Sequence, residues 1–208
     1  MDWISLIQTV ITAITSVIIA LIGAGYFKKM QDKKDEKKSR EKLVEQIQKD
    51  EVIHFTLREI RRRFNSDRIY VIQFHNGGYF YSKNPMQKAS VTYERNSDGL
   101  ERVGDKFQNI LVSNYTWYLG QMMSSRMFYT DLDNQMEDLP TMSLLKNYGN
   151  YAHAAVPIYD EGKNLIATLA LSWVFSEIPT TIIKEHNFSD EFKEELYEDA
   201  NSLRTYLV

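Results

Sequence analysis

The first part of the chain carries a long stretch without a charged side chain. It runs from Trp3 to Phe27 and reads WISLIQTVITAITSVIIALIGAGYF. At 1.5 Å of rise per residue, a helix of this length covers the roughly 30 Å of hydrocarbon in a bilayer. Its few hydroxyl and amide side chains can hydrogen-bond to the helix backbone, whereas an ionised group at mid-depth costs several kcal/mol. The stretch therefore predicts a transmembrane anchor over residues 1–28.

The charges beside this stretch predict its orientation. The tip before it is Met1-Asp2, and the segment after it reads KKMQDKKDEKKSREK. Lysine-rich flanks stay on the cytoplasmic side of a membrane. We therefore expect the lipid bilayer as a partner, a single pass through the inner (cell) membrane and a cytoplasmic C-terminal domain. A cleaved signal peptide is the competing interpretation, but such peptides have a basic tip and a shorter apolar run.

A long helix is predicted after the anchor. Residues 31–64 contain neither Gly nor Pro, and strong helix formers dominate. Ile53, Leu57, Ile60 and Phe64 follow a 4-3-4 spacing, which marks one apolar helix face. That face suits a short coiled coil between two copies, or packing onto the sheet of its own domain. The expected division of the chain is an anchor (1–28), a helical linker (29–64) and a cytosolic domain (65–208).

Composition excludes several classes of function. The 208 residues include no cysteine, so disulfides, thiol nucleophiles, iron–sulfur clusters and thioether-linked chromophores are excluded. The formal net charge of -3 gives no general attraction to nucleic acid. The Arg61–Arg63 run falls in the last turn of the predicted helix, where cations complement the helix dipole. No nucleic-acid partner is expected.

Strand and helix patterns alternate in the rest of the chain. RIYVIQF, rich in β-branched and aromatic residues, predicts a strand that ends at HNGG, and KASVTYER predicts a second strand. YAHAAVPIYD and LIATLALSWVF, joined by the turn EGKN, predict an antiparallel hairpin. The other expected elements are helices at 105–123 and 139–148, a short strand at 127–134, and a helix at 189–207 capped by Ser189.

This order of elements, with FHNG after the first strand and AAVPIYDEGKNLIATLALSW across the hairpin, resembles the GAF-type sensory domains. In that family the hairpin carries small residues and Pro before the turn, a glycine near it and an apolar last strand. The matching residues here are Ala155, Val156, Pro157, Ile158, Gly162 and Leu165 to Leu171. The resemblance covers roughly residues 41–208. It implies an α+β fold with a GAF-like antiparallel sheet flanked by helices, a pocket on one sheet face, and a homo-oligomer, usually a dimer, formed through the first and last helices.

Departures from the family limit what the resemblance implies. There is no cysteine to carry a bilin, and the spaced Asn, Lys, Phe, Asp and Glu set of the cyclic-nucleotide-binding members is absent. Neither ligand class is therefore expected, and no cofactor is predicted. The FHNGG stretch and the strand after it also resemble bacteriophage proteins.

Two residues at the end of the first predicted strand are candidates for ligand binding. His75 and Asn76 stand beside the flexible pair Gly77 and Gly78 and could point into a pocket. The alternative is a turn in which Asn76 hydrogen-bonds its own backbone and the glycines supply positive φ.

Three more candidates come from the strands and the helical middle. His153, in the first strand of the hairpin, could face the same pocket, although a lone strand histidine is more often structural. Tyr93 and Trp117 belong to a dense set of aromatic residues that could line a pocket, although core packing also explains them.

No pattern for catalysis or metal binding is present in the sequence. The histidines form no HxH, HxxxH or HxxE pair, and there is no GxSxG elbow or glycine-rich phosphate loop. Neither catalytic residues nor metal ligands are expected, and the chain is not expected to be an enzyme. The predicted function is a membrane-anchored cytosolic sensory or interaction module that binds a small molecule or a protein partner. The alternative is a phage-encoded membrane or virion-associated structural or assembly protein.

Overall fold

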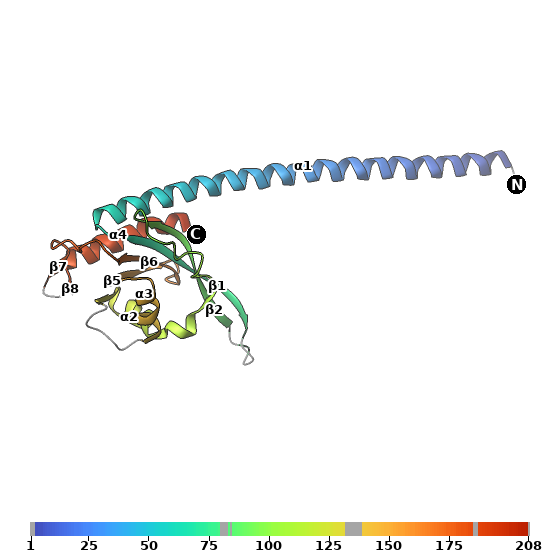
Figure 1. Ribbon diagram of the computed structural model, residues 1–208. Coiled ribbons are helices and arrows are strands. Elements are labelled where there is room, and N and C mark those ends of the chain that lie inside the picture. Colours follow the sequence, from blue (N-terminus) through green and yellow to red (C-terminus); the bar gives the residue numbers. More distant parts are fainter. Residues whose placement is uncertain (1–2, 80–82, 84, 132–138, 185–186, 208) are drawn as a thin grey trace. The chain divides into compact units, whose positions relative to one another are not determined.

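The computed structural model describes residues 3–79, 83, 85–131, 139–184 and 187–207 (Figure 1). Its contacts divide the chain into two compact units, Met1–Lys49 and Asp50–Val208, and each is described by itself. A single helix, α1 (Trp3–Arg63), begins in the first unit and ends in the second. The prediction of one long helix over 31–64 is confirmed, while the division at residues 28 and 64 stays a prediction.

Most side chains of residues 4–27, where the anchor is predicted, lie outside the described residues. Ser16 Oγ donates a hydrogen bond to the Thr12 carbonyl oxygen at 2.9 Å. Serine and threonine hydroxyls in helices commonly donate to the carbonyl oxygen four residues earlier. Across the described residues, no helix combines the length and the apolar character that a membrane span requires.

The second unit is built on a six-stranded antiparallel sheet in the order β3-β2-β1-β6-β5-β4. Its strands are β1 (Arg68–Tyr79), β2 (Pro85–Asn96), β3 (Ile110–Leu111), β4 (Phe128–Asp131), β5 (Ala152–Tyr159) and β6 (Leu165–Trp173). The other elements are η1 (Val112–Tyr115), α2 (Thr116–Ser125), α3 (Leu139–Asn147), the small ladder of β7 (Ile183–Lys184) with β8 (Asn187–Phe188), and α4 (Asp190–Leu207). The predicted α+β class, the β5–β6 hairpin and the closing helix are confirmed.

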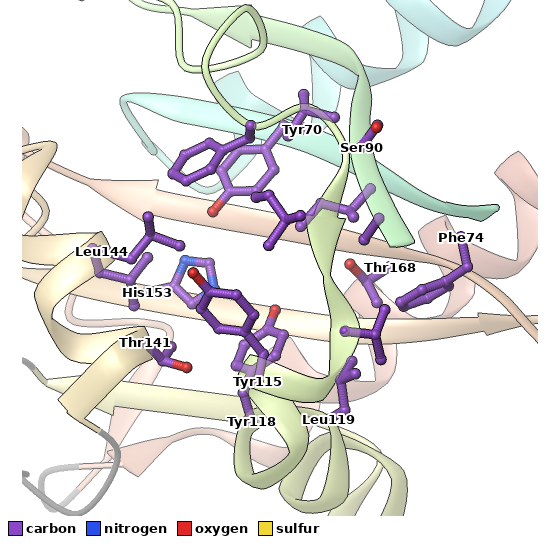
Figure 2. A pocket seen from close by; sticks show the side chains of 17 residues that line it. Tyr70, Phe74, Ser90, Tyr115, Tyr118, Leu119, Thr141, Leu144, His153 and Thr168 are labelled. Carbon is purple, nitrogen blue, oxygen red and sulfur yellow. The ribbon is translucent and has the colours of Figure 1, made fainter. Parts of the chain in front are cut away.

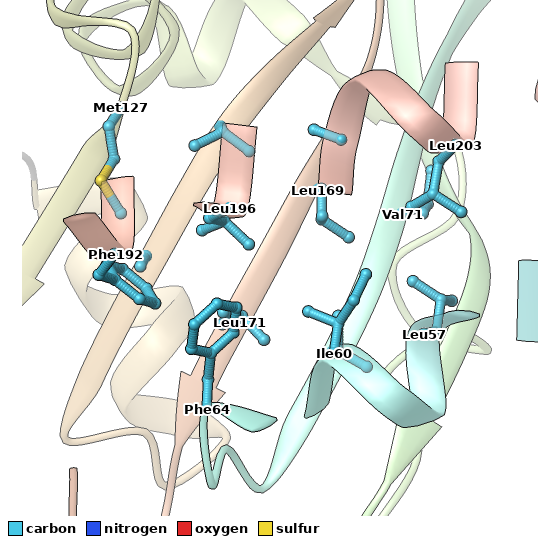
Figure 3. Close-up of a cluster of buried hydrophobic side chains, with 14 of the residues drawn as sticks. Leu57, Ile60, Phe64, Val71, Met127, Leu169, Leu171, Phe192, Leu196 and Leu203 are labelled. Carbon is cyan, nitrogen blue, oxygen red and sulfur yellow. The ribbon is translucent and has the colours of Figure 1, made fainter. Parts of the chain in front are cut away.

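One face of the sheet is sealed by α4 and by the last turns of α1 (Figures 1 and 3). The residues that meet there are Ile53, Leu57, Ile60 and Phe64 of α1, Phe192, Leu196, Ala200 and Leu203 of α4, and Val71, Leu169 and Leu171 of the sheet, all buried. The 4-3-4 stripe of α1 therefore packs onto its own domain. Trp173 fixes the junction, because its Nε1 donates to the Phe64 carbonyl oxygen at 3.3 Å.

The buried carboxylate of Asp67 joins the start of β1 to the end of β6. Its Oδ2 accepts backbone N–H hydrogen bonds from Val174, Phe175 and Ser176 at 2.7, 2.8 and 2.8 Å. Burial alone would raise the pKa of the Asp67 carboxyl, but these bonds and the one from the Ser176 hydroxyl outweigh it and hold the pKa below its ordinary value. The Asp67 carboxylate thus supplies a hydrogen-bond acceptor to three backbone N–H groups that lie just beyond the end of β6.

Two predictions about local structure are wrong. β1 does not end at HNGG: it continues to Tyr79 through a register shift, which Gly78 permits with φ +104°. The helix predicted over 105–123 forms only from Thr116 onward. Asn109 adopts φ +58°, outside the range of a right-handed helix, and Ile110 then pairs with Ala89 in the sheet.

Helix α1 offers a matched pair of substitutions that tests its place in the core. Leu57 is fully buried, whereas Phe55 on the same turn is 57% exposed. Leu57→Ala should lower the free energy of unfolding of the chain by about 2–5 kcal/mol, because it leaves a cavity beneath α1. Phe55→Ala should change it by less than about 1 kcal/mol. Urea denaturation measures both, and similar losses for the two variants would contradict the packing described.

Candidate functional site

The second face of the sheet carries a partly open cavity of about 80 Å³ beneath α2 and α3 (Figure 2). Strands supply its floor, because successive side chains alternate between faces and Tyr70, Ile72 and Phe74 of β1 all point the same way. His153 of β5 and Thr168 of β6 continue the floor. The walls and roof come from Phe107, Ile110, Val112, Tyr115, Tyr118, Leu119, Thr141, Leu144 and Leu145.

Aromatic packing holds the roof over the sheet. Tyr118 is buried in α2, and its ring meets the Phe128 ring of β4 edge-on with centroids 4.6 Å apart. The Phe107 ring packs against the Tyr148 ring in a tilted arrangement, with centroids 4.8 Å apart. In Figure 2 the Tyr70 ring enters the space from one side and the rings of Tyr115 and Tyr118 from the other. The side chains of three distant segments thus converge on one cavity.

No charged side chain lines this cavity among the described residues. Burial, together with the nearby Arg68, lowers the pKa of His153 to about 3, so its imidazole is neutral at pH 7. Burial also raises the pKa of Tyr70 to about 12 and that of Tyr118 well above its usual value, so both phenols keep their protons. The site therefore offers neutral hydrogen-bonding groups in an apolar setting.

A buried ion pair lies on the same face of the sheet, beyond the cavity lining. Arg68 Nε is 3.6 Å from Glu94 Oε1, and both side chains are almost fully enclosed. Arg68 also donates to the Asn150 side chain at 3.0 Å, and Glu94 accepts N–H bonds from Val103 and Gly104 at 2.9 and 2.7 Å. Because each charge has a partner and further hydrogen bonds, the pair as a whole is neutral, although the Arg68 charge still acts on His153 in the cavity lining.

His153 is the one predicted site residue that lines the cavity. Its Nδ1 is hydrogen-bonded to Ser172 Oγ at 3.0 Å, and Arg68, Ser172 and His153 stand in register across β1, β6 and β5. His153 therefore combines the two interpretations that the sequence left open: it is a satisfied structural residue, and it also forms part of the cavity floor.

His75 and Asn76 lie outside the cavity, beside a separate open depression that Gln87 and Asp160 also border. His75 Nε2 is hydrogen-bonded to Ser90 Oγ at 2.9 Å, and Asn76 Oδ1 accepts a bond from Gln87 at 3.3 Å. They were expected at a strand end, but β1 carries them onward along the ladder with β2.

Tyr93 and Trp117 do not line the cavity either. Tyr93 packs against the core on the α1 side of the sheet, and its hydroxyl donates to Asp50 Oδ1 at 2.7 Å. Trp117 is half-buried in α2 and meets Phe128 edge-on at 5.8 Å. The structure therefore does not bring the five predicted residues together. Across the described residues there is also no group of three His, Cys, Asp or Glu side chains that could hold a metal ion.

Sequence reasoning missed Tyr70 and Thr168 as cavity residues. Both lie inside strands in which apolar residues occupy positions on both faces, so the sequence does not show which face of the sheet borders a cavity. The period of two was a usable signal, since Tyr70, Ile72 and Phe74 share one face. Tyr118 belonged to the aromatic set noted in the sequence, but nothing distinguished it from its neighbours.

Comparison with known proteins supports the fold. No family model matches the sequence, and no curated protein matches it. The PixJ GAF domain of Thermosynechococcus elongatus, in its blue-light-absorbing form, superposes with a TM-score of 0.57 and 15% identity over 77% of this chain and 84% of that one. The chain has the GAF fold.

Two further GAF structures give the same result. The GAF domain region of a Geobacter sulfurreducens PCA protein matches with a TM-score of 0.56 and 14% identity, over 80% of this chain and 97% of that one. The phycoerythrobilin-bound GAF domain of a cyanobacterial phytochrome matches with a TM-score of 0.57 and 14% identity, over 80% and 88%. At such identities the likeness establishes the GAF fold alone.

The buried imidazole predicts a dependence of stability on pH. Its pKa is about 3 in the folded chain against an ordinary 6.5, so between these values the unfolded chain binds the extra proton and the folded chain does not. The contribution of neutral, buried His153 to the free energy of unfolding is complete above pH 6.5. It is lost as the pH falls from 6.5 toward 3, at up to about 1.4 kcal/mol per pH unit.

His153→Gln keeps a neutral polar side chain but has no proton to gain. Its free energy of unfolding should therefore fall less steeply than that of the wild type between pH 6.5 and about 3. Urea unfolding at several pH values in this window measures the two slopes. Equal slopes would show that His153 is not held neutral by burial.

Proposed function

We propose that the Asp50–Val208 unit is a sensory module that binds a small molecule in the cavity between the sheet and helices α2 and α3. The observation that carries the proposal is the apolar cavity of about 80 Å³ between the sheet and two short helices. Because its lining is almost entirely apolar, a ligand that fills it would remove apolar surface from water, and this favours binding.

The similar structures support a sensory function but not a shared ligand. One of them is a phycoerythrobilin-bound GAF domain. This chain has no cysteine, and its cavity of about 80 Å³ is smaller than the roughly 300–1,000 Å³ of pockets for drug-sized ligands. We therefore infer a smaller ligand, held without a thioether bond.

A screen of soluble metabolites against the whole chain tests the proposal. Ala89 lines the cavity from β2, so Ala89→Leu adds three carbon atoms to the lining and should weaken binding of a cavity ligand at least tenfold. Thr92→Leu, on the same strand but exposed, is the matched control and should leave binding unchanged. Ligand-detected NMR gives the affinities. A ligand that binds the Ala89→Leu variant as tightly as the wild type would not bind in the cavity. If no metabolite binds the wild type, the proposal has no support.

The proposal also includes membrane attachment through residues 1–28. Its support is the uncharged stretch from Trp3 to Phe27 and the lysines that follow it. Self-association through α1 and α4 stays a prediction from the family resemblance, and no contact among the described residues favours the phage-assembly alternative.

Fractionation of cells that produce the chain tests the attachment. The whole chain should sediment with membranes and resist extraction by carbonate, whereas a variant that lacks residues 1–28 should not. Replacing Ile18 and Ile19 by lysine in the whole chain should have the same effect, because two charges at mid-depth oppose insertion. Sedimentation of the truncated variant with membranes would show that residues 1–28 are not the anchor.

A further inference from the structure

The chemistry of the cavity restricts the class of molecule that it can hold, and this inference rests on the proposed function. Size gives the first restriction. At about 10–15 Å³ for each water-sized group, a cavity of about 80 Å³ has room for roughly five to eight heavy atoms. Nucleotides, bilins and most cofactors exceed this by several-fold.

Charge gives the second restriction. The described lining contains no Asp, Glu, Lys or Arg, and the neighbouring Arg68 is paired with Glu94. An ionised ligand would give up its hydration without meeting an opposite charge, and burial of an unpaired charge is strongly unfavourable. A carboxylate or an amine is therefore a poor occupant.

One hydroxyl gives the third restriction. Thr168 Oγ1 is buried and has no hydrogen-bond partner among the described residues. Its register partners are Ile72 on β1 and Pro157 on β5, and neither has a polar side chain. Tyr118 lies near enough for the Thr168 hydroxyl to act against the rise that burial gives the pKa of Tyr118, but the two hydroxyls do not meet hydrogen-bond geometry.

Figure 2 places Thr168 on the floor of the cavity, across from Tyr115 and Tyr118. Buried hydroxyl groups almost always have a partner, so an unpartnered one that faces a cavity indicates where a ligand atom would bind. We propose that the cavity takes an uncharged, largely apolar molecule of about five to eight heavy atoms, with one polar group that hydrogen-bonds to Thr168. Small phenols and alcohols belong to this class.

Three probes of similar shape test the class on the whole chain. Phenol carries one hydroxyl on a ring, toluene replaces the hydroxyl by a methyl group, and benzylammonium, which has eight heavy atoms and stays within the size limit, adds a charge. We expect phenol and toluene to bind and to shift the NMR signals of cavity residues, and we expect benzylammonium not to bind at pH 7. Benzylammonium binding as tight as that of phenol would overturn the inference.

Substitutions at Thr168 identify the polar contact. Thr168→Val keeps the shape and removes the hydroxyl, so it should weaken phenol about tenfold and leave toluene unchanged. Thr168→Ser retains a hydroxyl and should bind phenol as the wild type does. Thr92→Val, the same change at an exposed position, is the control. An equal loss of phenol and toluene affinity in Thr168→Val would overturn the assigned contact.

The outcomes separate this inference from the proposed function. If no probe binds, but a charged or larger metabolite binds the wild type and not Ala89→Leu, the inference fails and the proposed function stands. If neither the probes nor any metabolite bind, both fail.

Discussion

The central strands of the sheet are apolar on both faces, so other elements have to cover both faces. This requirement determines the arrangement of residues 50–208. Side chains of β5 and β6 are buried almost without interruption, so neither face can be left to solvent. The end of α1 and α4 cover one face, and α2 and α3 cover the other (Figure 1). The arrangement of helices follows from the composition of two strands.

The two coverings differ in how completely they fill the space. On the first face, α4 is a helix of 18 residues, and its Phe192 ring meets Phe64 edge-on at 4.7 Å and packs against the tilted ring of Phe188 at 4.4 Å between centroids. On the second face α2 has only 10 residues and α3 only 9, and a cavity is left between them and the sheet. The buried groups around that cavity are neutral or paired, because an unpaired charge would be too costly there. The small size and the neutral lining of the cavity therefore follow from the same requirement that arranges the fold, namely that helices cover both faces of an apolar sheet.

Local signals in the sequence predicted the elements that depend on neighbouring residues. The β5–β6 hairpin has its turn at EGKN, and α4 starts at a cap in which Ser189 Oγ accepts the Phe192 N–H at 3.2 Å. The same spacing rules failed where a single residue changed the backbone, as Asn109 did at φ +58° and Gly78 at φ +104°. The cavity was harder to predict, because it depends on which face of an apolar strand meets a short helix. Of the five candidate residues only His153 reaches it, and Thr168 carried no signal of its own.

The most direct test asks whether an apolar cavity lies between the sheet and helices α2 and α3, and it uses crystals of the whole chain under xenon pressure. Xenon binds in apolar cavities of proteins. We expect a xenon atom between the sheet and helices α2 and α3, in contact with Tyr70, Tyr118 and Thr168. Side chains that close this space, or xenon bound only elsewhere in the molecule, would contradict this expectation.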